Sequence, residues 1–247
     1  MAKQAGLGDL FFVDGVDLSG DVGAVQKIGA PSDPLDVTGI NKSAHERIYG
    51  LYDGMIQFNS YFNDAVGAAL ATLKAKGSGA DRIVTYMHGS TLGAGFAAQL
   101  VAKQLNYDGT RADDGALTFD AEAQGNGYGL EYADLLTAGK RTDTSATNGT
   151  GVDGGAASAA GLAATLQVFA FAGTSVTVAI EESSDNGGGD AFAAVTGGAF
   201  AAASAVGAQR IVTSLSLAVE RYLRVVTTGT FSNAVFVVTV TRAPYAS

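Results

Sequence analysis

The chain of 247 residues contains no cysteine, no tryptophan, two histidines and three prolines. Without cysteine it can form no disulfide, no thiolate nucleophile and no cysteine-bound metal site. A catalytic serine would need a histidine base, yet only His45 and His88 exist and no serine lies in a G-x-S-x-G elbow. The sequence therefore offers few of the groups that hydrolytic enzymes use.

Positive charge is scarce as well. The chain has 15 Lys and Arg against 24 Asp and Glu, which gives a net charge of −9. Nucleic-acid binding needs clustered positive charge, so this chain is a poor candidate for gripping DNA or RNA. Charge is also uneven: residues 1–150 carry 11 basic and 18 acidic residues, whereas residues 151–247 carry four arginines and six acidic residues. This shift predicts two domains, 1–150 and 151–247.

No long apolar run is present. The most apolar window, residues 156–173, is interrupted by Ser158, Thr165 and Gln167 and is rich in alanine, so it does not predict a membrane span. The first residues, MAKQAGLGDLFF, lack the apolar core of a signal peptide. We therefore expect a soluble protein that is synthesised in the cytoplasm and does not insert into a membrane.

What the sequence does contain is 34 glycines together with abundant Thr, Val and Ala, a composition typical of short strands joined by tight turns. Ile56, Phe58 and Ser60 alternate with polar residues, which predicts a strand with one buried face. Asp-Gly suits a type I′ turn, so residues 47–62 are predicted to form a hairpin with its tip at Asp53-Gly54.

Other segments give weaker predictions. Asp14-Gly15 is predicted to be a turn between a strand and a second strand or extended arm. Residues 29–46 hold two prolines and no clear period, which indicates a long loop. Residues 64–77 form the best helix pattern, with Asp64 as the N-cap and lysines near the C-terminal end. Residues 137–161 have few bulky apolar side chains and are predicted to be a flexible linker or long surface loop.

His45-Glu46 begins like the H-E-x-x-H zinc signature, but Tyr49 stands where the second histidine would be. G-x-G-x-x-G occurs at 149–154, in a low-complexity stretch without the strand and helix that phosphate binding requires. Neither motif predicts a site. Other residues could in principle contribute to a site, because they are charged or, for Asn148, fit a glycosylation pattern. They are Asp14, Asp17, Asp21, Asp113, Asp114, Asp185, Glu46, Glu122, Glu131, Glu181, Glu182, Glu220, Arg221, Arg224 and Asn148.

None of these positions forms a recognisable set. The aspartates lack the order of a calcium loop, and nothing selects two glutamates as a glycosidase pair. Asp185-Asn186-Gly187 is predicted to be a turn, and Arg221 to Arg224 a solvated strand face. We therefore predict no catalytic, cofactor-binding or metal-binding residue and no cofactor, and a structural or binding protein rather than an enzyme.

Several stretches resemble the major tail proteins, or tail tube proteins, of long non-contractile-tailed phages, especially those that infect actinobacteria. In the first half these stretches are FFVDGVDLSGDVGAV, VTGINKSAHERIYGLYDGMIQFNSYFN, DRIVTYMHG, VAKQLNYDGTRADDGALTFDAEAQGNGYGLEY and LTAGKRTDT. In the second half, TSVTVAIEESSD, FAAVTGGAF and YLRVVTTGTFSNAVFVVTV are similar to the extra β domain that such proteins often append. The similarity spans most of the chain and contains no catalytic signature.

The resemblance implies a mainly β fold: a tail-tube-type β-sandwich with one short flanking helix, a long loop and an N-terminal arm, plus an external C-terminal Ig-like β-sandwich. It implies self-association into hexameric rings that stack into a tube, with the loop and arm reaching the neighbouring ring. Other tail proteins (tape measure, terminator and distal tail) would be partners. Double-stranded DNA would pass through an acidic lumen without specific binding, because like charges repel.

The same resemblance places the protein in the virion, as part of the phage tail, and implies contact of the C-terminal domain with host surface glycans. Three alternatives stay open from the residues alone. The chain could be a capsid decoration or tail terminator protein, a carbohydrate-binding β-sandwich module, or a hydrolase of unknown type. The absence of tryptophan disfavours the carbohydrate-binding module, and the absence of an identifiable base or nucleophile disfavours the hydrolase.

Overall fold

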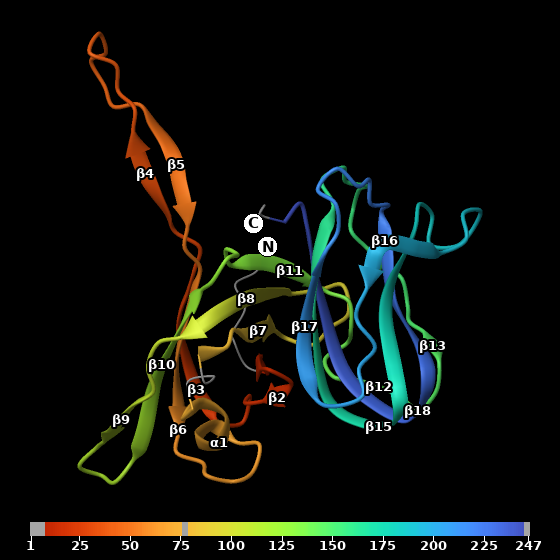
Figure 1. Ribbon diagram of the computed structural model, residues 1–247, viewed down its shortest axis with the longest axis horizontal. Helices are drawn as coiled ribbons and strands as arrows, with labels where there is room; N and C mark the ends of the chain where they lie inside the picture. Colours follow the sequence, from red (N-terminus) through yellow and green to blue (C-terminus); the bar gives the residue numbers. More distant parts are fainter. Residues whose placement is uncertain (1–7, 76–78, 245–247) are drawn as a thin grey trace.

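The computed structural model describes residues 8–75 and 79–244 and is mainly β, which confirms the predicted fold class (Figure 1). Neighbouring strands of both sheets are antiparallel. In chain order the elements are β1 (Leu10–Val13), β2 (Val16–Asp17), β3 (Val22–Gly29), β4 (Ser32–Asp36), β5 (Arg47–Tyr52), β6 (Met55–Tyr61), α1 (Ala69–Leu73), β7 (Arg82–His88), β8 (Phe96–Gln104), β9 (Asp108–Arg111), β10 (Leu117–Gly125), β11 (Glu131–Leu135), β12 (Arg141–Asp143), β13 (Thr147–Asn148), β14 (Val152–Asp153), β15 (Leu162–Ser183), β16 (Ala193–Ala199), β17 (Gly207–Val212) and β18 (Tyr222–Arg242).

The first half of the chain forms an N-terminal lobe, which consists of β1–β3, β6–β10 and α1. Its sheet runs from the edge strand β3 through β6 and β10 to β8, and β7 and β1 continue beyond β8. Ile56 and Phe58 of β6 are buried, as the alternation predicts, and pack with Phe11, Leu100 and Leu130. In the described part of the chain, no helix is long and apolar enough to cross a membrane.

The predicted Asp14-Gly15 turn is confirmed. It joins β1 to β2 with Val13 opposite Val16, and both turn residues have positive φ, 51° and 80°. Two positive φ values in a two-residue loop are the signature of a type I′ hairpin. The resemblance also implies an N-terminal arm, but residues 1–7 lie outside the described residues.

The predicted hairpin over 47–62 is wrong. β6 pairs with β3 and β10, whereas β5 pairs with β4 in a separate two-stranded sheet. Asp53-Gly54 is the point where the chain passes from one sheet to the other. Gly54 is needed there because a Cβ would collide with the backbone nitrogen of Leu130, and its φ is not positive. The predicted loop 29–46 is likewise only partly a loop, since β4 occupies Ser32–Asp36.

The predicted helix over 64–77 is much shorter in the structure. α1 covers Ala69–Leu73, and Asp64 does not cap it; its final predicted residues lie outside the described ranges. Five residues cannot sustain a helix alone, so side chains from the body hold both ends. Asp21 accepts the first helical amide at 2.8 Å, and Arg82 and Gln104 donate to the last carbonyls, each at 2.8 Å.

The C-terminal lobe, β12–β18, is built on the long strands β15 and β18, which pair along their lengths and bend together (Figure 1). The register places two extra residues in β15 and one in β18 at this bend. Side chains alternate along a strand, so one extra residue reverses the inward positions and two restore them. Accordingly, β15 points even-numbered Leu166 and Val178 inward, whereas β18 switches from Val225 to Phe236.

The predicted flexible linker or long surface loop over 137–161 is only partly a loop, because three short strands interrupt it. It contains β12, β13 and β14, each of which pairs with β18. Ladder hydrogen bonds come from the backbone and need no bulky side chain, so low apolar content did not reveal these strands. Arg141 and Asp143 of β12 form an ion pair at 2.8 Å, and Arg141 also donates to the Val225 carbonyl at 2.8 Å.

The two lobes share backbone and side-chain contacts. β11 pairs with β8 through Glu131–Ala133 and with β18 through Asp134–Leu135. A buried apolar cluster fills the junction, and a polar network lies beside it. Glu131 pairs with Arg210 at 2.6 Å and accepts a hydrogen bond from Gln99 at 2.9 Å. The junction cluster consists of Phe12, Met87, Ala97, Ala133, Leu135 and Val237, with Leu10 and Phe169 packed against it.

Candidate assembly surface

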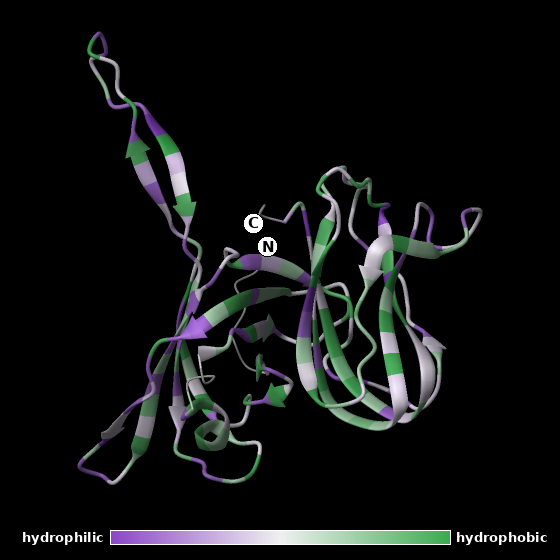
Figure 2. Ribbon diagram, viewed as in Figure 1, coloured by the Kyte–Doolittle hydropathy of each residue, from purple (hydrophilic) through white to green (hydrophobic). Residues whose placement is uncertain are grey.

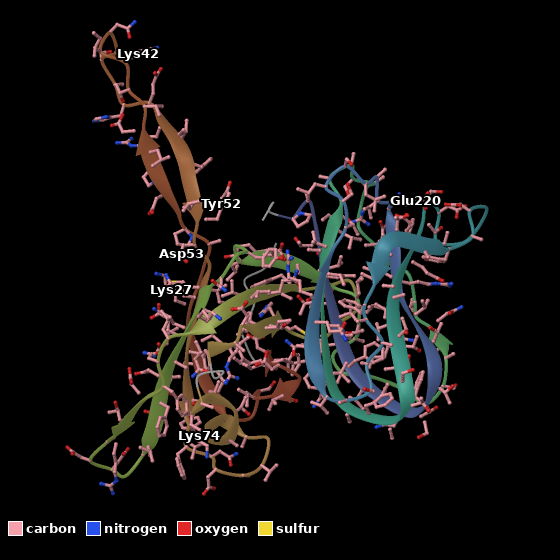
Figure 3. The ribbon with its side chains drawn as sticks, in the orientation of Figure 1. Lys27, Lys42, Tyr52, Asp53, Lys74 and Glu220 are labelled. Atoms are coloured by element: carbon pink, nitrogen blue, oxygen red, sulfur yellow. The ribbon has the colours of Figure 1, made fainter. Side chains whose placement is uncertain are left out.

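A long two-stranded ribbon, β4–β5 with its connecting loop 37–46, stands away from the body at the upper left of Figure 1. Lys42 lies near its far end, and Tyr52 and Asp53 lie at its base (Figure 3). Figure 2 shows hydrophobic and hydrophilic residues mixed along both strands. An isolated two-stranded ribbon is only marginally stable in water, so its order needs an explanation.

Hydrogen bonds fix the base of the ribbon. Asp53 donates its amide to the Pro31 carbonyl at 2.8 Å, and its carboxylate accepts from Gln124 of β10 at 2.7 Å. Gly125 donates to the Gly54 carbonyl at 2.7 Å. The ribbon is therefore attached to the body by both backbone and side-chain contacts.

The far end of the ribbon is also ordered by its own side chains. Asp36 accepts hydrogen bonds from the Thr38 hydroxyl and amide, and His45 lies 2.7 Å from the same carboxylate. The Thr38 side chain, its amide and then His45 hold the pKa of Asp36 below its usual value. Lys42 and Glu46 form an ion pair at 2.9 Å. The charges of the loop are thus largely paired with one another.

Large apolar side chains are concentrated on this ribbon. Seven of the sixteen exposed large hydrophobic residues that the structure describes lie there, and Ile40, Leu51 and Tyr49 are 109%, 87% and 81% exposed. Exposed apolar groups in contiguous sets mark interaction sites. The full set is Leu35, Val37, Ile40, Ile48, Tyr49, Leu51 and Tyr52. The ribbon is therefore the strongest candidate for a protein–protein contact.

A second group, here called the aromatic patch, consists of the partly buried Tyr86 and His88 and the exposed Phe96 and Tyr132 on β7, β8 and β11. The Phe96 ring lies 5.5 Å from His88, 6.0 Å from Tyr86 and 6.2 Å from Tyr132. Phe96 and Tyr132 are 40% and 55% exposed. Asp9 fixes the patch from below by pairing with His88 at 3.0 Å and accepting a hydrogen bond from Tyr86.

The structure keeps the two histidines apart. His45 lies on the exposed ribbon loop beside Asp36, whereas His88 lies at the end of β7 beside Asp9. Across the described ranges, no three His, Cys, Asp or Glu side chains cluster closely enough to hold a metal ion.

Four of the five candidate aspartates of the N-terminal lobe have a structural partner. Asp14 pairs with Arg82 at 3.2 Å, Asp17 pairs with Lys140, and Asp21 bonds the start of α1. Burial raises the pKa of Asp14 despite that arginine. Asp114 accepts the Ala116 amide at 3.0 Å within the turn after β9, next to Asp113 in sequence.

The candidates of the C-terminal lobe also hold the fold together. Residues 149–154 include β14 and bond to β18, and no helix follows them as far as residue 244. Asp185 accepts amide hydrogen bonds within its own loop, at 2.9 Å from Gly188, so the predicted turn is confirmed. Arg221 pairs with Asp153 at 2.6 Å, and Asn148 lies exposed on β13.

The candidate glutamates have separate partners. Glu122 accepts from Gln57 at 2.9 Å, and Glu181 pairs with Arg224 at 2.6 Å. Glu182 accepts the Glu220 amide at 2.8 Å, Glu131 is buried at the lobe junction, and Glu46 lies on the ribbon. Burial comes first among the causes that raise the pKa of Glu220, followed by Asp190, Glu182 and Asp185.

No family model and no curated protein matches the chain. Among solved structures, a chain from the tail of an empty GTA particle with C6 symmetry matches at 17% identity and a TM-score of 0.41, covering 53% of this chain and 98% of that one. The SPP1 Dit protein, described as a paradigm of the hub adsorption apparatus in phages that infect Gram-positive bacteria, matches at 11% identity and a TM-score of 0.35. That match covers 95% of this chain and 99% of Dit.

Proposed function

We propose that the chain is a structural subunit of a phage tail: the major tail tube protein, which self-associates into stacked hexameric rings that conduct the genome. The projecting β4–β5 ribbon carries this proposal. Hydrogen bonds attach its base to the body, the charged side chains of its loop are paired with one another, and its large apolar side chains face solvent. A monomer gains nothing from exposing such a surface, whereas a subunit of an assembly buries it.

The asymmetry of the ribbon favours an open, stacking assembly. It projects from one side of the body, so a copy that receives it uses a different surface from the copy that supplies it (Figure 1). When two copies do not exchange such contacts reciprocally, contacts between unlike surfaces build rings and open stacks rather than two-fold dimers. The aromatic patch is one exposed surface of suitable chemistry on the body.

Charge fits passage of DNA through such a tube. A net charge of −9 per subunit would repel the phosphate backbone if carboxylates line the channel, so DNA would slide without binding. In this proposal the protein acts without catalysis or a cofactor, resides in the virion, and meets the tape measure, terminator and distal tail proteins at the ends of the tube.

We further propose that residues 1–150 form the tube domain and that residues 151–247 form an external domain able to contact host surface glycans. Strands β12 and β13, which precede residue 151, pair with β18 of the second half. A variant that contains the second half alone would therefore have to include β12 and β13. Binding of the intact chain to an array of bacterial cell-wall polysaccharides tests the glycan contact, and uniform absence of binding would contradict it.

Negative-stain electron microscopy of the purified chain at high concentration tests the main proposal. We expect stacked rings or tubes with a channel wide enough for duplex DNA. Trimers or single rings that do not stack would indicate a capsid decoration or terminator protein instead. Because a tube subunit can wait for an initiator, the test is repeated with sonicated tail fragments as seeds. A chain that stays monomeric in both conditions would overturn the proposal.

A further inference from the structure

Asparagine is followed directly by glycine at three places in the chain: Asn126-Gly127, Asn148-Gly149 and Asn186-Gly187. This dipeptide has a reactivity of its own. The backbone nitrogen of the glycine can attack the side-chain carbon Cγ of the asparagine, and glycine hinders the attack least because it has no Cβ. All three asparagines are exposed to water, so exposure alone does not distinguish them.

Deamidation of an Asn-Gly pair consumes only water. A bond forms between the glycine nitrogen and Cγ, the glycine N–H proton passes to solvent, and the side-chain nitrogen takes up a proton and leaves as ammonia. The succinimide ring that results adds one water molecule and opens at either of its carbonyl groups. The products are aspartate and isoaspartate, and each carries one more negative charge than asparagine.

The fold protects Asn148. The attack requires a glycine nitrogen that is free to turn toward the asparagine side chain, and an N–H that donates a hydrogen bond must first give it up. Gly149 donates its N–H to the Val225 carbonyl at 2.8 Å, in the ladder that pairs β13 with β18. The guanidinium of Arg141 also crowds Gly149 so closely that a Cβ would not fit there. Cyclisation at Asn148 therefore requires the strand to open.

Asn186 is protected by its own loop. Gly187 donates its N–H to the Ser183 hydroxyl at 2.8 Å. The side-chain oxygen of Asn186 lies against Gly151, where it leaves no room for a Cβ. The adjacent Asp185 accepts amide hydrogen bonds within the same loop, and its negative charge opposes the loss of a proton from a neighbouring amide. Both the contacts and the charge therefore slow the reaction here.

Asn126 lies in the turn between β10 and β11 and lacks this protection (Figure 1). Within the described residues the N–H of Gly127 donates no hydrogen bond, and a Cβ on Gly127 would meet no atom within 4 Å. The Asn126 amide donates to Asp81 at 2.8 Å, but this bond is exposed and water can replace it. Lys103 pairs with the same carboxylate at 2.8 Å, so the local charge does not oppose proton loss.

We propose that Asn126 is a site of spontaneous deamidation in the folded protein, and that the fold protects Asn148 and Asn186. The inference does not depend on the proposed function. The new carboxylate forms beside Asp81, and isoaspartate adds one methylene to the backbone of the turn that precedes β11. Because β11 pairs with strands of both lobes, the modification changes charge and chain path close to the lobe junction.

Peptide mapping by mass spectrometry tests the selectivity. The folded chain is incubated in mildly alkaline water enriched in heavy oxygen, which labels each new carboxylate, and a second sample is treated alike in enough urea to unfold it. Comparing the two rates at each site removes the effect of neighbouring sequence. We expect folding to slow the reaction at Asn148 and at Asn186 by at least about threefold more than at Asn126. Equal slowing at the three sites, or stronger slowing at Asn126, would overturn the proposal.

N126S and the matched control N148S give a second readout, because each replaces an exposed asparagine with a small polar residue. Circular dichroism and thermal unfolding first establish that both variants fold as the parent does. Isoelectric focusing then follows the more acidic form during incubation. We expect N148S to accumulate it as fast as the parent and N126S to do so at least about threefold more slowly. An unchanged rate in N126S, or no acidic form from the parent, would overturn the proposal.

Discussion

Gln167 of β15 accepts a hydrogen bond from the Gly15 amide at 2.6 Å, and so connects the C-terminal lobe to the first hairpin of the N-terminal lobe. Its side-chain nitrogen donates to the Ile83 carbonyl at 3.0 Å and to the Thr85 hydroxyl at 3.1 Å. Gln167 is fully buried, so every polar atom of its amide is satisfied inside the protein. Two segments more than 150 residues apart thus depend on one side chain.

Substitution Q167L should test this connection. Leucine has a similar size but leaves the buried Gly15 amide without a partner, whereas the Ile83 carbonyl keeps its hydrogen bond from the Asp14 amide at 3.1 Å. We expect the free energy of unfolding in urea to fall by about 1–3 kcal/mol, the cost of one unsatisfied buried donor. Q26L is the control, because Gln26 is exposed; it should change stability by less than about 0.5 kcal/mol. Equal effects of the two substitutions would contradict the connection.

The buried pair of Glu131 and Arg210 gives a second prediction. E131Q keeps an acceptor for Gln99 but leaves the charge of Arg210 unpaired in the junction. There the central guanidinium carbon of Arg210 lies 4.0 Å from the centroid of the Tyr128 ring. Breaking a buried ion pair in this way should destabilise the protein by about 3–5 kcal/mol. The double variant E131Q/R210M removes the uncompensated charge and should recover part of that loss. No recovery in a urea double-mutant cycle would show that the two charges are not coupled.

Glu220 should make the protein less stable as pH rises. Burial, Asp190, Glu182 and Asp185 raise its pKa above the usual 4.5, so ionisation costs more in the folded state than in the unfolded chain. This destabilisation is absent below pH 4.5 and develops as pH rises through the folded pKa. E220Q should therefore have a higher Tm than the parent at pH 7 and the same Tm near pH 4. A constant Tm difference across this range would refute the linkage.

Asp153 should behave in the opposite way. Hydrogen bonds from Arg221 and then from the Gly155 amide lower its pKa from 3.8 to about 2. A lowered carboxyl pKa contributes stability above pH 3.8 that is lost as pH falls through about 2. D153N should therefore be less stable than the parent at neutral pH, with the gap closing in acid. Thermal unfolding of both proteins from pH 2 to 7 checks this, and a gap that widens in acid would contradict it.

The sequence predicted the class of the fold and the buried face of β6 correctly, because both follow from local patterns. It did not predict which strands pair with each other. Asp14-Gly15 and Asp53-Gly54 are the same dipeptide between similar strands, yet the first forms a type I′ hairpin and the second joins two different sheets. The choice depends on β3 and β10, which pair with β6 from elsewhere in the chain, and no local period contains that information.

The sequence did not predict the candidate assembly surface, and the reason is related. Leu35 and Val37 alternate with Asp36 and Thr38, but this run is short and follows two prolines, so residues 29–46 were not predicted to contain a strand. The available signal was the run of Leu35, Val37 and Ile40 in a segment predicted to be a loop. Large aliphatic residues in a long loop are unusual enough to indicate a buried role in an assembly.

The bend shared by β15 and β18 makes the C-terminal lobe sensitive to chain length in steps of one residue. Ser232 is the single extra residue of β18 at that bend. Deleting it would exchange the two faces of the following segment, moving Phe236, Val238 and Val240 out of the core of this lobe to the face that packs on the N-terminal lobe, although no apolar side chain would be lost. The lobe should therefore fail to fold without Ser232 and tolerate S232A. The number of residues in β15 and β18 therefore affects the folding of this lobe as much as the identity of those residues does.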